Sequence, residues 1–178
     1  MKNNLFNSDS YYPIDRDCLG KILVRTFARY IGNCPDSDIS DDIFYKGKNQ
    51  FPGDTLIYWQ HKKLSCEIKT SGKLSNHFGD HYAFAKWRCS AQSGKLKLPF
   101  DRLFCIGLPA KGYGLCAPPN SPKALKSCEF FVLPYLEIPG SNQFQPYLRT
   151  LHKQSYFKYY AHGSDYNACC NLWHQMWN

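Results

Sequence analysis

Two neighbouring runs of apolar, β-branched and aromatic residues constrain the fold of this chain most strongly. They read DTLIYWQ from Asp54 to Gln60 and KLSCEIKT from Lys63 to Thr70, with only two polar residues between them. Short runs of this composition, separated by so few residues, are typical of an antiparallel β-hairpin. The sequence therefore predicts a hairpin over residues 54–70.

The charged residues of this hairpin are predicted to share one face. Side chains alternate between the two faces of a strand. A turn at Gln60 and His61 places Asp54 opposite Glu67, whereas a turn one residue further along places Asp54 opposite Lys69, and the sequence allows both. In either register the three charged residues lie together at the open end of the hairpin. The opposite face is apolar and is formed by Thr55, Ile57, Trp59, Leu64, Cys66 and Ile68.

The flanking segments predict a mixed α/β fold. Apolar residues at three- and four-residue steps predict a helix over residues 17–30, and a similar pattern predicts a second helix over residues 80–91. The run RLFCIGL predicts a buried strand over residues 102–108. Residues 128–136 are interpreted as a further strand, and the aromatic-rich residues after 145 as helical. A basic stripe on the first helix, formed by Lys21, Arg25 and Arg29, is interpreted as solvent-exposed.

The charge of the chain favours a polyanionic partner. Its 178 residues include 22 Lys and Arg against 14 Asp and Glu, a formal net charge of +8. Such an excess fits DNA or RNA. No apolar run is long enough to span a membrane, and the first residues do not resemble a secretory signal. We therefore expect an intracellular, cytoplasmic protein without a membrane partner.

Two groups of residues have metal-binding spacing, and in both cases another interpretation is favoured. His77 and His81 would share a helix face, but Gly79 between them favours a loop and a helix cap. The nine cysteines form no C-x-x-C pair. A zinc site with His162 and His174 is one possibility, but buried thiols in a reducing compartment are favoured. The cysteines concerned are Cys105, Cys116, Cys128, Cys169 and Cys170.

The charged face of the hairpin has the composition of a metal site. Two carboxylates roughly 5–8 Å apart repel each other unless a cation lies between them. Mg²⁺ prefers carboxylate oxygens and water as ligands. Lys69 would then stabilise negative charge on a phosphate or orient an attacking water. The alternative is a solvated face on which Glu67 and Lys69 form a weak ion pair.

Asp54, followed after twelve residues by Glu67-Ile68-Lys69, resembles the motif of the PD-(D/E)xK nucleases, the restriction-endonuclease-like superfamily. The resemblance covers residues 15–110. It implies an α/β core of helix, hairpin, helix and strand, with a mixed sheet flanked by helices. Residues 1–178 would form a single nuclease domain. Residues 15–110 would be its catalytic core, and residues 111–178 an extension for DNA recognition or dimerisation.

The resemblance also implies roles for individual residues. Asp54, Glu67 and Lys69 would be catalytic, and Asp54, Glu67 and the carbonyl of Ile68 would bind Mg²⁺, for which Mn²⁺ would substitute. Gly53 departs from the family pattern by separating Pro52 from the aspartate. Many members supply a further acid from the first helix. The candidates for this third acid are Asp17, Asp41 and Asp42.

The implied function is a Mg²⁺-dependent endonuclease that hydrolyses phosphodiester bonds of double-stranded DNA as a homodimer. The first candidate is a sequence-specific restriction or homing endonuclease, and the alternative is a resolvase or repair nuclease of the same fold. A non-catalytic nucleic-acid-binding protein would keep the charge without the metal. Basic residues near the motif are candidate DNA contacts, since phosphate contacts give affinity. They are Lys62, Lys63, Lys73, His77, Lys86 and Arg88.

Overall fold

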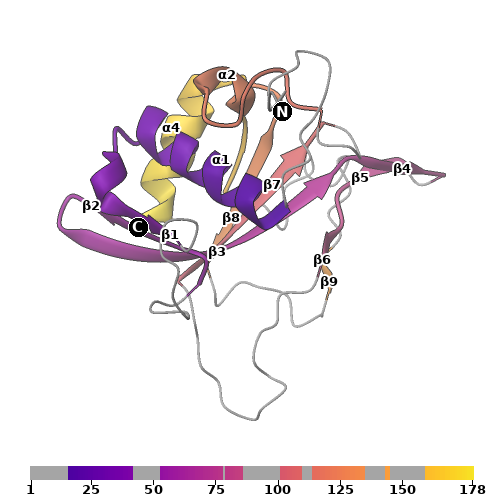
Figure 1. The fold of residues 1–178 in the computed structure, drawn as a ribbon. Helices are drawn as coiled ribbons and strands as arrows, with labels where there is room; N and C mark the ends of the chain where they lie inside the picture. The colour runs from indigo at the N-terminus through magenta and orange to yellow at the C-terminus, as the bar shows by residue number, and fades with distance from the viewer. Residues whose placement is uncertain are drawn as a thin grey trace, which may run out of the picture.

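A six-stranded mixed sheet forms the centre of the computed structural model (Figure 1). The structure describes residues 16–41, 53–77, 79–85, 101–109, 114–134, 143–144 and 159–178. In spatial order the strands are β1 (Ile39–Asp41), β2 (Thr55–Trp59), β3 (Lys62–Gly72), β7 (Arg102–Leu108), β8 (Glu129–Pro134) and β10 (Tyr160–His162). Strands β3 and β7 are parallel, and the other neighbours are antiparallel. Two small ladders pair β4 (Leu74–Asn76) with β5 (Gly79–His81) and β6 (Phe84–Ala85) with β9 (Gln143–Phe144).

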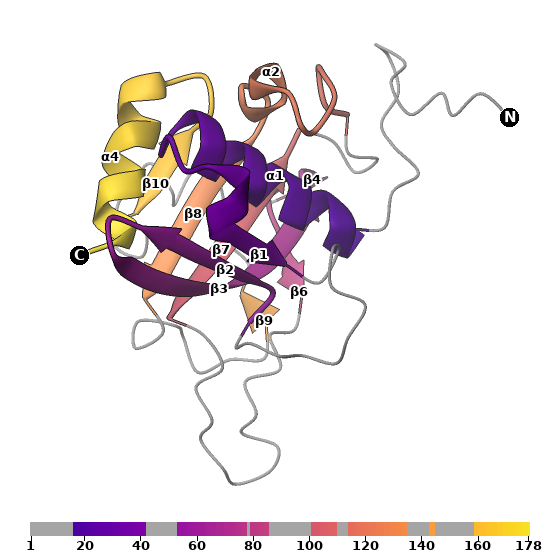
Figure 2. The same cartoon turned by 60° about the vertical axis from the view of Figure 1, so that its left-hand side comes forward.

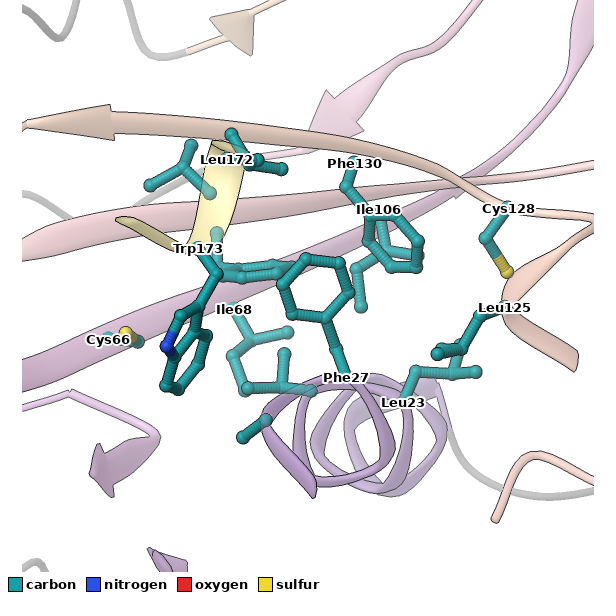
Figure 3. Close-up of a cluster of buried hydrophobic side chains, with 14 of the residues drawn as sticks. Leu23, Phe27, Cys66, Ile68, Ile106, Leu125, Cys128, Phe130, Leu172 and Trp173 are labelled. Carbon is teal, nitrogen blue, oxygen red and sulfur yellow. The ribbon is translucent and has the colours of Figure 1, made fainter. Parts of the chain in front are cut away.

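One face of the sheet is covered by helices α1 (Arg16–Tyr30), α2 (Pro122–Leu125) and α4 (Tyr166–Met176) (Figure 2). Their apolar side chains and those of the sheet form one buried cluster (Figure 3). At its centre the Phe27 ring lies 4.7 Å from Phe130, 5.5 Å from Phe104 and 6.4 Å from Trp173 between ring centroids. Segments before and after residue 110 therefore share one core. Among the described residues, no helix is long and apolar enough to cross a membrane.

The hairpin closes in the first of the two predicted registers. Trp59 pairs with Lys62, so Gln60 and His61 form the turn, and both have positive φ values, of 48° and 66°. Positive φ at both central residues defines a type I′ turn, whose twist matches that of the flanking strands. The paired ladder ends with Thr55 opposite Cys66, and beyond it the Asp54 amide donates to the carbonyl of the same Cys66.

Most of the predicted elements are confirmed, but the helix predicted over residues 80–91 is wrong where the structure describes it. Residues 79–85 contain strands β5 and β6 instead, and residues 86–91 lie outside the described ranges. Tyr82 packs on Gly107, where a Cβ atom would lie 2.5 Å from the Tyr82 ring. The Phe84 ring packs on Phe131 at 5.8 Å. These long-range contacts favour an extended segment across the sheet over a local helix. Helix α1 and strands β7 and β8 agree with the sequence prediction. Of the residues after 145, expected to be helical, Tyr166–Met176 form α4, Tyr160–His162 form strand β10 instead, and residues 145–158 lie outside the described ranges.

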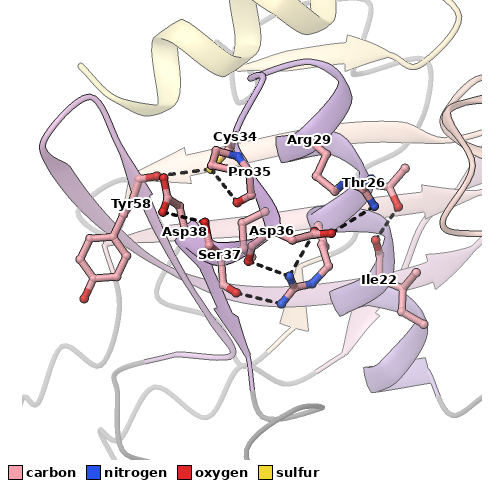
Figure 4. A network of polar contacts seen from close by, with 11 residues as sticks. Ile22, Thr26, Arg29, Cys34, Pro35, Asp36, Ser37, Asp38 and Tyr58 are labelled. Carbon is pink, nitrogen blue, oxygen red and sulfur yellow. Dashed lines mark hydrogen bonds and ion pairs between the residues drawn. The ribbon is translucent and has the colours of Figure 1, made fainter.

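The basic stripe of α1 is solvent-exposed only at Arg29. Lys21 is buried, and Arg25 and Arg29 both bind Asp36 in the 3-10 turn η1 (Asp36–Asp38) (Figure 4). Arg25 Nη2 also donates to the carbonyl of Ile39 at 2.9 Å. The carboxylate and backbone carbonyls of this turn need hydrogen-bond donors, and the two arginines supply them. These bonds fix the segment that leads into β1 at the edge of the sheet.

Close packing of α1 on β3 gives the first prediction. A Cβ atom at Gly20 would lie 2.8 Å from Cγ2 of Ile68. Helix propensity alone predicts that Gly20→Ala stabilises the protein by about 1 kcal/mol. Overpacking costs about 1–3 kcal/mol. We expect a net loss of up to about 2 kcal/mol in the free energy of unfolding, measured by urea denaturation.

The background variant Ile68→Ala is the control, because it removes the methyl group that the new Cβ would meet. There the cost of Gly20→Ala should shrink, since contacting residues are energetically coupled. A gain in stability from Gly20→Ala in the wild-type background would contradict the observed contact between α1 and β3.

Candidate active site

The structure brings the three residues of the proposed motif to one face of the sheet, opposite the face that helices α1, α2 and α4 cover. Asp54 directly precedes β2, and its amide donates to the carbonyl of Cys66 at 2.8 Å. Glu67 and Lys69 lie two residues apart on β3 and so point to the same side. The apolar side of the hairpin, with Ile57, Leu64, Cys66 and Ile68, faces the core.

The three side chains are held by specific contacts. Asp54 Oδ2 accepts a hydrogen bond from the Ile68 amide at 2.8 Å. Lys69 Nζ lies 2.5 Å from Glu67 Oε1, and the two side chains are 19% and 20% exposed. This partial burial distinguishes them from a fully solvated surface pair, because screening by water is reduced.

Partial burial and the nearby carboxylate of Asp54 both affect the pKa of Glu67. Burial raises the pKa of Glu67 above its ordinary value of 4.5, and the charge of Asp54 raises it further. Lys69 acts in the opposite direction, through its charge and its hydrogen bond, without cancelling the increase in the Glu67 pKa. The repulsion between Asp54 and Glu67 is the kind that a bound divalent cation relieves.

Buried side chains of β7 lie beside the charged residues of β3. In the parallel register Leu103 lies beside Glu67 and Cys105 beside Lys69, and both side chains are fully buried. Burial raises the pKa of the Cys105 thiol, so it stays protonated at neutral pH. The Cys105 thiol therefore provides a neutral wall for the site rather than a nucleophile.

A second polar group on the same face has no clear signal in the sequence. Glu129 at the start of β8 is 9% exposed and accepts hydrogen bonds from the hydroxyls of Tyr82 and Tyr160, the latter at 2.7 Å. Burial and the Glu129 contact raise the pKa values of both tyrosines. The three residues come from distant parts of the chain. Only the acid inside the apolar run CEFFVLPYL could have indicated them.

The other predicted site residues are placed as follows. Asp17 lies in α1 and Asp41 in β1, where its backbone pairs with Thr55, but the side chains of both fall outside the described part of the chain. Asp42 lies outside it entirely, as do Lys86 and Arg88.

The candidate DNA contacts in the described ranges differ in exposure. Lys62 and Lys63 are exposed beside the hairpin turn, His77 is exposed in the turn between β4 and β5, and Lys73 is half-buried. The helix cap expected from His77 and His81 is wrong, because His81 belongs to strand β5.

The donor set of the hairpin fits a hard divalent cation in type, with two carboxylates. Asp54 and Glu67 offer carboxylate oxygens, and Ile68, whose carbonyl the resemblance implies as a further ligand, donates its amide to Asp54. In the described ranges, no group of three His, Cys, Asp or Glu could hold a metal ion, and this applies to the late cysteines too. Cys116 and Cys128 instead donate to the backbone carbonyls of Lys123 and Ala124. Mg²⁺ commonly completes its coordination with water, so two carboxylates can suffice.

Comparisons with known proteins give no further guidance. No protein-family model, no curated protein and no solved structure matches this chain. The resemblance to the PD-(D/E)xK nucleases therefore rests on the residues of the motif and their geometry.

The raised pKa of Glu67 predicts a pH dependence of stability in metal-free protein. The folded state binds the Glu67 proton more tightly than the unfolded state, whose pKa is near 4.5. The contribution of Glu67 is therefore fully present below pH 4.5 and is lost as the pH rises through the folded pKa. In EDTA, wild type should lose stability relative to Glu67→Gln between pH 4 and pH 8, measured by urea denaturation. Parallel pH profiles for the two proteins would contradict the crowded carboxylate pair.

Proposed function

We propose that this protein is a divalent-metal-dependent DNA endonuclease that hydrolyses phosphodiester bonds. The observation that carries the proposal is the meeting of Asp54, Glu67 and Lys69 on one sheet face, with Lys69 Nζ 2.5 Å from Glu67 and Ile68 bonded to Asp54. These are the residues that a PD-(D/E)xK nuclease uses, at the corresponding positions of the hairpin.

The chemistry assigns a separate task to each residue. Asp54 and Glu67 would hold Mg²⁺ or Mn²⁺, which lowers the pKa of a bound water and neutralises charge on the scissile phosphate. The Ile68 amide orients Asp54 through its 2.8 Å hydrogen bond. Lys69 neutralises Glu67 while no cation is bound. Once Glu67 binds a cation, the Lys69 ammonium can stabilise the charge of the pentavalent transition state.

The distribution of charge also supports a polyanionic substrate. The described residues contain 11 of the 22 Lys and Arg but 10 of the 14 Asp and Glu. The excess of +8 therefore comes almost wholly from the remaining segments. Residues 86–100 and 145–158 carry most of it and contain no acid. We propose these segments, together with Lys62 and Lys63, as the main source of phosphate affinity. Action on duplex DNA as a homodimer belongs to the same proposal.

A non-catalytic nucleic-acid-binding protein is the second candidate, and the Glu67–Lys69 ion pair favours it. Each group already neutralises the other at 2.5 Å, which satisfies both without a metal ion. In this case binding would be unaffected by EDTA, and no cleavage would follow.

Cleavage of plasmid and junction DNA tests the proposed function. With Mg²⁺ or Mn²⁺ the wild type should cut, and EDTA should abolish cutting. Asp54→Ala and Lys69→Ala should each reduce the rate by at least about 10²-fold, the usual effect of removing one group that stabilises transition-state charge. Both should still bind DNA in a mobility-shift assay.

Lys126→Ala is the matched control, because Lys126 is exposed at the end of α2, on the helical side of the sheet. It should cut like the wild type. Full cleavage by Asp54→Ala or by Lys69→Ala would refute the site, and binding without any cleavage by the wild type would favour the second candidate.

A further inference from the structure

The hairpin carries a second cross-strand pair on the face of the candidate site. Tyr58 pairs directly with Lys63, next to the turn. Successive residues on one face of a strand are about 6.8 Å apart, so this pair lies about 13 Å from Asp54 and Glu67. The intervening row consists of Leu56 and Ser65, both buried.

Tyr58 and Lys63 are exposed without an evident structural task. The Tyr58 side chain is 44% exposed, one of three large hydrophobic side chains exposed in the described part of the chain. Its ring points away from the polar network around η1 (Figure 4). Lys63 is exposed and has no ion pair within the described ranges. By contrast, exposed Tyr30 has the guanidinium of Arg29 5.4 Å from its ring centroid.

An exposed aromatic ring beside a cation has the chemistry of a single-stranded nucleic-acid site. Bases stack on aromatic side chains whatever their sequence, while cations track the phosphates. A base inside an uninterrupted duplex already stacks on its neighbours and cannot use such a platform. Asp38 of η1 lies on the opposite side of Tyr58 from Lys63, and its negative charge disfavours a phosphate there. A phosphate would therefore lie on the Lys63 side of the Tyr58 ring.

We propose that Tyr58 and Lys63 form a subsite for an unpaired nucleotide of the DNA substrate, Tyr58 stacking on the base and Lys63 contacting a phosphate. The inference rests on the proposed nuclease function and narrows its substrate to DNA with an unpaired strand near the cut. Nucleotides rise about 3.4 Å each along a strand in B-form geometry. An unpaired strand extends further per nucleotide, so a separation of about 13 Å corresponds to at most about four nucleotides between the scissile phosphate and the subsite.

Binding in EDTA tests the subsite without cleavage. The probes are a fluorescein-labelled DNA strand of mixed sequence and its blunt duplex, followed by anisotropy. Tyr58→Ala should weaken binding of the strand about tenfold and leave the duplex unchanged, whereas Tyr58→Phe should keep the affinity. Lys63→Ala should lower the slope of log Kd against log salt for the strand by about 0.7, the value for one phosphate contact.

Tyr166→Ala and Lys126→Ala are the controls, because Tyr166 is exposed at the start of α4 and Lys126 directly after α2, and in the described part of the chain neither forms a hydrogen bond or ion pair with the hairpin. They should bind both probes like the wild type. If Tyr58→Ala and Lys63→Ala behave like these controls, or if Tyr58→Ala weakens the strand and the duplex equally, the subsite is refuted.

Substrate length separates a direct contact from a structural defect. After the cut is mapped on flap DNA, the unpaired strand is shortened so that it ends one nucleotide from the cut, too short to span the separation of about 13 Å. Tyr58→Ala should slow single-turnover cleavage of the long flap to the rate of the short flap, and should not affect the short flap. Equal slowing of both flaps would refute the proposal.

These experiments also distinguish this inference from the function on which it rests. Failure of the wild type to cut any DNA, or full activity of Asp54→Ala, removes the proposed nuclease and the subsite together. Cleavage that depends on Asp54 but not on Tyr58 or Lys63 removes the subsite alone.

Discussion

The register of the β2–β3 hairpin is the constraint on which the rest of this structure depends. Side chains alternate along a strand, so a slip of one residue in β3 would exchange its two faces. Glu67 and Lys69 would enter the core beneath Phe27, and Cys66 and Ile68 would face outward. The turn at Gln60 and His61 and the burial of Cys66 and Ile68 prevent this slip. The geometry of the site is therefore secured by hydrophobic burial on the opposite face.

The sheet separates two kinds of environment. On one face, helices α1 and α4 and the sheet enclose an apolar cluster that includes Phe27 and Trp173. On the other face, polar groups are partly or wholly buried, with Asp54 and Glu67 at one end and Glu129 at the other. Buried polar groups persist when they are hydrogen-bonded, and the bonds from Tyr82 and Tyr160 to Glu129 meet that condition. Only the first group keeps two acids close together, which makes it the candidate for chemistry.

The sequence predicted the elements whose signals are local. Helix α1 and strands β2, β3, β7 and β8 carry their own apolar periodicity, and the shared face of Asp54, Glu67 and Lys69 follows from strand alternation. The choice of register was not predictable, because Gln60 and His61 lack the glycine or asparagine that usually marks a type I′ turn. Residues 80–85 were misread because Tyr82 packs on Gly107, 25 residues away, and that contact overrides local helical periodicity.

The charge of Lys69 bears on how Asp54 and Glu67 would behave without a metal ion and with one bound. Two acids this close resist full ionisation, as the raised pKa of Glu67 indicates. Lys69 supplies one positive charge at 2.5 Å, which is less than a divalent cation would supply. A metal ion binding Asp54 and Glu67 would therefore replace a weaker counter-charge. The Lys69 ammonium would remain on the same strand face, two residues from Glu67. An ammonium beside two acids is attracted by both, so this placement stabilises an ion pair and would equally suit the proposed task of neutralising a phosphate.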